Sequence, residues 1–74
     1  MATVNFEKHI YEGWTVADFI DELEPLMDMI QNGNSYIKPM RTKAEIKKYT
    51  SENQPYYPKP IPDVVEYFCN RYGI

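Results

Sequence analysis

His9 and Cys69 are the only histidine and the only cysteine in the 74 residues. As a nucleophilic pair they would need an activated thiolate and a third group that orients the imidazole. Cys69 instead falls on the apolar stripe of a predicted helix, which favours a buried thiol. One histidine and one cysteine cannot alone form a structural zinc site, and the three glycines form no phosphate-binding loop. We therefore expect a protein that is not an enzyme and that uses no cofactor or metal.

The charged residues are divided along the chain. Residues 1–31 carry seven acids and one base, whereas residues 32–60 carry six bases and two acids, and the net charge is −3. Such a division indicates that the two regions either pair with each other or face different partners.

Acidic side chains cover the polar side of a predicted helix within residues 15–31. This surface could be solvated, could pair with the basic region, or could dock onto a basic groove of a partner, including a groove that normally holds nucleic acid. Long-range attraction would speed such docking. The partner-binding hypothesis includes four of these acids: Asp18, Asp21, Glu22 and Asp28.

The basic stretch "KPMRTKAEIKKY" supports an alternative function, as a nucleic-acid-binding accessory protein or transcriptional regulator. Its cations could contact phosphates, and Tyr36 and Tyr49 could stack on bases. The pI of about 5.0 argues against a dedicated nucleic-acid binder. The residues of this alternative are Lys38, Arg41, Lys43, Lys47 and Lys48.

The stretch "QPYYPKPIPD" holds four of the six prolines. These prolines predict a stiff, polyproline-like path that serves as a spacer between helices. Because adjacent residues of an extended chain point to opposite sides, we expect one of Tyr56 and Tyr57 to be buried and the other to project outward beside Lys59. An outward tyrosine on a stiff backbone is a good interface anchor, so all three residues join the partner-binding hypothesis.

Apolar spacing and end signals predict three helical segments. Residues 15–31 begin with a Thr15 cap, and Pro25 predicts a kink or a division into two short helices. Residues 42–50 begin with a capping box, and residues 62–72 begin with a proline and end before Gly73. The remaining segments are an N-terminal arm (1–14), in which "TVNF" could form an edge strand, and a Pro/Tyr connector (51–61).

These elements predict one compact, mainly α domain of three to four helices over residues 1–74. Both long apolar stripes need burial, so one core should contain the following residues: Ile20, Leu23, Met27, Ile30, Val64, Phe68 and Tyr72. A chain this short has a thin stability margin. An exposed aromatic patch would favour a homodimer; its expected members are Tyr11, Trp14, Tyr56 and Tyr57.

The sequence predicts a cytoplasmic protein. A single cysteine is typical of a reducing compartment. The N-terminus lacks the basic region and apolar core of a secretory signal. No apolar run approaches the length of a membrane span, so we expect no association with a membrane.

The stretches "GWTVADFIDELEP" and "NQPYYPKPIPDVVEYFCNRYGI" resemble small open reading frames carried by phages and prophages of Gram-positive bacteria. The resemblance covers residues 12–74. It implies a protein that works in the cytoplasm of an infected host and binds a host or phage protein, which it inhibits or redirects. Components of antiviral defence are among the implied targets. The resemblance assigns no functional residues.

Overall fold

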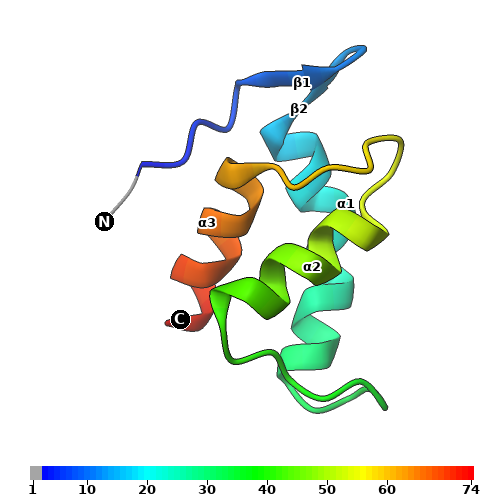
Figure 1. Cartoon of the computed structure of the whole chain (residues 1–74), viewed down its shortest axis with the longest axis vertical. Helices are drawn as coiled ribbons and strands as arrows, with labels where there is room; N and C mark the ends of the chain where they lie inside the picture. The colour runs from blue at the N-terminus through cyan, green and yellow to red at the C-terminus, as the bar shows by residue number, and fades with distance from the viewer. Residues whose placement is uncertain (1–2) are drawn as a thin grey trace.

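Three helices and a two-stranded hairpin make up the part of the chain that the computed structural model describes, residues 3–74 (Figure 1). In chain order the elements are β1 (His9–Tyr11), β2 (Trp14–Thr15), α1 (Val16–Gln31), α2 (Lys43–Asn53) and α3 (Pro62–Tyr72). The predicted small, mainly helical fold is therefore confirmed. Residues 1 and 2 of the predicted N-terminal arm lie outside the described residues.

The hairpin lies directly before α1. β1 and β2 are antiparallel, and Tyr11 pairs with Trp14 across a two-residue turn. Both turn residues, Glu12 and Gly13, have positive φ angles of 31° and 84°, as the twist of a two-residue hairpin requires. The N-terminal arm does contain a short strand, but it lies at His9–Tyr11 and not at "TVNF", the stretch that could have formed it.

The segment before the hairpin helps to begin α1. The carbonyls of Phe6 and Lys8 each accept a hydrogen bond of 3.0 Å from one of the first two amides of α1. Thr15 caps the helix as predicted, and it forms a capping box with Asp18, with reciprocal bonds of 3.4 and 2.8 Å to each other's backbone amides. The backbone groups left free at a helix N-terminus thus find partners within the fold.

α1 is one helix with Pro25 in its interior rather than two short helices. A proline there removes one backbone hydrogen bond. Leu23 and Met27, on either side of it, are both buried in the same core. We attribute the continuity of α1 to this packing, since most helical stability in proteins comes from an amphipathic face that is buried.

α2 begins with the predicted capping box, in which Thr42 and Glu45 bond each other's backbone amides at 3.1 and 3.2 Å. The helix continues to Asn53, three residues beyond the predicted end. The side chains of Thr50 and Asn53 each donate to the backbone carbonyl four residues earlier at 2.8 Å. Polar side chains that suit a loop are thus accommodated in the last turns of the helix.

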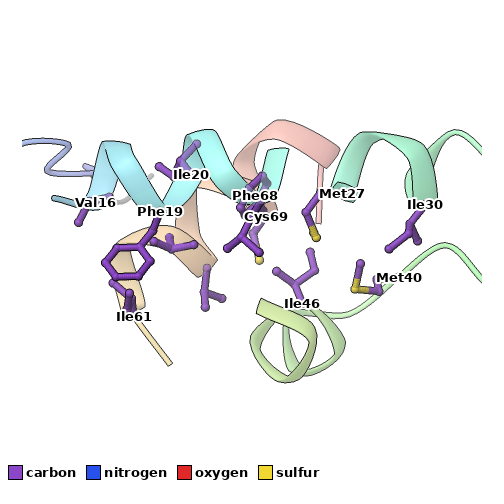
Figure 2. Close-up of a cluster of buried hydrophobic side chains, with 13 residues drawn as sticks. Val16, Phe19, Ile20, Met27, Ile30, Met40, Ile46, Ile61, Phe68 and Cys69 are labelled. Atoms are coloured by element: carbon purple, nitrogen blue, oxygen red, sulfur yellow. The ribbon is translucent and has the colours of Figure 1, made fainter. Parts of the chain in front are cut away.

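α3 has the predicted bounds, and Gly73 caps it in the left-handed conformation with a φ of 70°. The core lies where the three helices meet. Figure 2 shows side chains of α1 turned toward those of α2 and α3. The residues predicted to share one core do so, with Tyr72 partly buried at its margin. The buried apolar residues are Val16, Phe19, Ile20, Leu23, Met27, Ile30, Met40, Ile46, Ile61, Val64, Val65, Phe68 and Cys69.

Candidate partner-binding surface

The exposed side chains of α1 differ in kind between its two halves. Those of the first half are all acidic, and those of the second half are all apolar. Since they recur at three- and four-residue steps, they lie along one open face of the helix. From the N-terminal end, the exposed residues of α1 are Asp18, Asp21, Glu22, Pro25, Leu26 and Met29.

Two further acids of α1 are held by α3 instead. Arg71 donates two hydrogen bonds to the carboxylate of Asp28, at 3.0 and 2.9 Å, and the hydroxyl of Tyr72 donates a third at 2.5 Å. The hydroxyl of Tyr67 donates to Glu24 at 2.5 Å. Asp28, predicted to bind a partner, therefore already has three donors within the fold. This network links α1 to α3.

The network makes the stability of the fold depend on pH. The hydrogen bonds from Arg71 and then from Tyr72 hold the pKa of Asp28 below its ordinary value. A carboxyl with a lowered folded-state pKa stabilises the fold above its unfolded-state pKa, and this contribution is lost as the pH falls through the folded-state value. We expect the melting temperature of Asp28→Asn to lie a few degrees below wild type at about pH 7, and this gap to narrow toward acidic pH as Asp28 becomes protonated in the folded state.

Circular dichroism melts across that pH range would measure the gap. The control is Glu52→Gln, which removes an exposed charge on α2. A gap between wild type and Asp28→Asn that stays constant as the pH falls would show that the Asp28 network contributes no pH dependence.

Trp14 lies beside the acidic half of α1. Its side chain and the first turns of the helix border an open hollow of about 350 Å³, which is lined by Gly13, Trp14, Asp18, Asp21 and Glu22. The short link from β2 to α1 brings the indole to this position. The hollow thus combines an aromatic wall with three carboxylates, a combination that suits a cationic side chain.

An aromatic cluster joins the hairpin to the connector before α3. The Trp14 ring meets Tyr56 edge-on at 5.7 Å between ring centroids and lies 5.2 Å from the buried Phe19. Tyr57 lies 6.5 Å from Tyr11 and 6.3 Å from Phe19. The cluster brings the predicted aromatic patch together from two distant segments. Through Trp14 the cluster borders the acidic hollow, whereas Tyr56 lines a separate hollow beside the end of α2.

Tyr56 and Tyr57 differ in exposure. Tyr56 is 71% exposed, whereas Tyr57 is half-buried and packs against the core. Lys59 is exposed. The straight extended path expected here is wrong at Tyr56, which has a left-handed φ of 58°. The chain therefore bends at Tyr56, and simple alternation does not explain why its ring faces outward.

Gln54 holds this bend in place. Its side chain is 8% exposed, and its Nε2 donates to the backbone carbonyls of Tyr57, at 2.6 Å, and of Lys59. Its Oε1 is buried and has no hydrogen-bond donor among residues 3–74. The unsatisfied Oε1 of Gln54 and the left-handed backbone of Tyr56 are two energetically unfavourable features within three residues. The connector is thus fixed by one glutamine rather than by its prolines alone.

We expect Gln54→Ala to lower the free energy of unfolding by about 1–3 kcal/mol, because two carbonyls lose their donor. Urea denaturation followed by Trp14 fluorescence would report both stability and the surroundings of the ring next to Tyr56. Glu52→Ala, two residues earlier and exposed, is the control. Wild-type stability in Gln54→Ala would mean that the glutamine does not hold the connector.

The basic segment does not pair with the acidic helix. The two ion pairs found among residues 3–74 both involve Arg71. The five cations of the nucleic-acid alternative are all exposed, and four of them divide between two places. Lys43 and Lys47 border a hollow beside α3, whereas Lys38 and Lys48 border another beside Tyr49. The sequence left two alternatives open: the acidic and basic regions pair with each other, or they face different partners. The arrangement of the basic residues fits the second alternative.

The residues considered for catalysis lie in unlike settings. His9 is exposed on β1, whereas Cys69 is buried on α3, and burial raises the pKa of its thiol. A raised pKa is the reverse of what a nucleophilic cysteine needs. Within residues 3–74 no group of three or more His, Cys, Asp or Glu side chains is placed to hold a metal ion.

None of the described helices is both long enough and apolar enough to cross a membrane. Comparison with protein-family models, with curated proteins and with solved structures finds no match for the chain. The case for a function therefore rests on the geometry of the chain itself.

Sequence reasoning missed two parts of this surface. It did not include Leu26 and Met29 in the partner-binding hypothesis, whereas both are exposed on the same face as Glu22. The helical phase of these residues was a usable signal, since they follow Glu22 by four and seven positions. It also missed the network around Arg71, for which a separation of 43 residues from Asp28 gave no local signal.

Proposed function

We propose that the protein is a non-enzymatic module that binds a basic surface of another protein. The observation that carries this proposal is the placement of three exposed carboxylates beside Trp14, whose ring contacts the exposed Tyr56. The carboxylates are those of Asp18, Asp21 and Glu22. They attract a basic partner over distance, and the rings supply contact area once it has arrived.

The resemblance to small phage proteins narrows the proposed partner to a host or phage protein that the module inhibits or redirects. A protein of antiviral defence, or one that handles nucleic acid, presents the basic groove that an acidic surface fits. Docking there would occupy the groove in place of nucleic acid. Asp28 and Tyr57 support this surface from within the fold. Lys59 follows Tyr57 by two positions in the connector and is exposed.

The test is titration of a fluorescently labelled, unstructured Lys/Arg-rich peptide with the folded protein. Wild type should bind, and the double variant Asp21→Asn/Glu22→Gln should bind about tenfold more weakly at low salt. Asp18 is left unchanged, because it also caps α1.

The control variant, Glu7→Gln/Glu66→Gln, removes the same net charge from the hairpin side and from α3. It should bind close to wild type. If the two double variants weaken peptide binding equally, the weakening is due to net charge and not to this surface. If the peptide does not bind wild type, the proposal is wrong.

Nucleic-acid binding is the second candidate. It is favoured by the five exposed cations of residues 38–48, which form no ion pair among the described residues. Duplex DNA of random sequence, titrated at about 50 and 200 mM salt, tests it. We expect no specific binding of duplex DNA to wild type, and therefore no difference between wild type and Lys43→Ala/Lys47→Ala. Binding that falls steeply with salt and disappears in that variant would favour this second function over the first.

A further inference from the structure

The second half of the open face of α1 leaves large apolar side chains in water. Leu26 and Met29 are 43% and 44% exposed and are not among the buried core residues. Pro25 lies next to them and is also exposed. A surface helix usually turns a polar face to solvent, so exposed apolar residues here are unusual.

This apolar half continues the acidic surface without a break. From Asp18 to Met29 the open face spans twelve residues, or about 16 Å of helix. Glu22, the last of the exposed acids, precedes Pro25 and Leu26 by three and four positions, so their side chains are neighbours on the helix. A partner that covers the acids and lies along α1 therefore meets the apolar residues next.

We propose that α1 docks an amphipathic helix of the partner protein. The basic end of that helix lies on Asp21 and Glu22, and its apolar residues lie on Pro25, Leu26 and Met29. The inference rests on the proposed function and adds the class of partner to it. A helix of about three turns matches the length of the open face, and its charge order is the complement of the order along α1.

Other occupants fit less well. A bilayer with anionic lipids would repel the acidic half of the face. A second copy of the chain offers α2, whose exposed residues near its start are mainly charged: Lys43, Ala44, Glu45, Lys47 and Lys48. None of the described helices joins exposed bases at one end to exposed large apolar residues at the other.

The experiment uses a labelled synthetic peptide of about 18 residues, long enough to cover the open face. It carries leucines at helical spacing in one half and lysines on the same face in the other. A second peptide has the same composition in an order that leaves no apolar face. We expect the ordered peptide to bind at least about tenfold more tightly to wild type than the shuffled one.

The decisive variant is Leu26→Ser/Met29→Ser, which should weaken binding of the ordered peptide about tenfold and leave the melting temperature near that of wild type. The matched control is Ile37→Ser/Ile74→Ser, which changes two apolar residues of similar exposure, 37% and 40%, outside α1. It should bind as wild type does.

The outcomes separate the two proposals. If the apolar variant binds as wild type while Asp21→Asn/Glu22→Gln binds weakly, the helical partner is wrong and the proposed function stands. If neither variant changes binding, both are wrong. Equal affinity for the two peptides overturns the helical partner. The helical partner is also overturned if wild type sediments as a homodimer and Leu26→Ser/Met29→Ser sediments as a monomer. In that case a second copy of the chain covers the apolar half of the face.

Discussion

A Leu23→Ala variant should lose about 2–5 kcal/mol of the free energy of unfolding, the range for removing a buried leucine side chain. Leu23 is 1% exposed and lies in the middle of α1, where the core brings the three helices together. The loss should be near the upper end if the neighbouring helices cannot close the cavity. A domain of this size has roughly 5 kcal/mol or little more to lose, so a loss at the upper end of the range would leave much of the variant unfolded at room temperature.

Leu26→Ala is the matched control, because it makes the same chemical change on the same helix at an exposed position. We expect it to change stability by no more than about 0.5 kcal/mol. Urea denaturation of both variants would measure the two losses. Equal losses would mean that α1 packs with a different face inward from the one seen in the structure.

Phe19→Ala should have a comparable or larger effect, about 3–5 kcal/mol. Phe19 is fully buried, and its ring contacts both Trp14 and Tyr57. It therefore joins the hydrophobic core to the aromatic part of the candidate surface. Its removal should destabilise the fold and free the rings that line the surface.

A Phe19→Leu variant separates these two consequences. It keeps most of the apolar volume, so the loss of stability should stay below about 1.5 kcal/mol. The Trp14 emission should nevertheless shift to longer wavelength, because the indole loses its ring partner and gains water. Phe6→Leu is the control, since Phe6 is 45% exposed and packs on Tyr67 instead. An unchanged Trp14 spectrum in Phe19→Leu would show that Phe19 does not position the surface.

Local signals in the sequence were sufficient for the helices. The capping boxes at Thr15 and Thr42, and Gly73 after α3, are short-range features that depend on neighbouring residues. The core followed from apolar spacing, because only one arrangement buries the stripes of both α1 and α3. The acids at 21 and 22 are exposed for the same reason, as they lie opposite the stripe.

The features that could not be predicted depend on contacts between distant segments. Arg71 of α3 donates two hydrogen bonds to Asp28, so the carboxylate of Asp28 is not free for a partner as those on the open face are. No residue near Asp28 in the sequence indicates this contact. The bend at Tyr56 depends on the Gln54 side chain, and prolines alone favoured a straight path. The contact of Tyr56 with Trp14 in turn depends on that bend. Each required the assembled fold.

The most direct test of a basic, helical partner docked on α1 is a chemical-shift map. ¹⁵N-labelled protein would be titrated with the ordered Leu/Lys peptide, and backbone amides and the Trp14 indole would be followed. The expected changes cluster at Trp14, Asp21, Glu22, Leu26 and Tyr56, with little change in residues 38–48. Changes confined to residues 38–48, or scattered over the surface without a cluster on α1, would contradict the assignment of this face as the binding site.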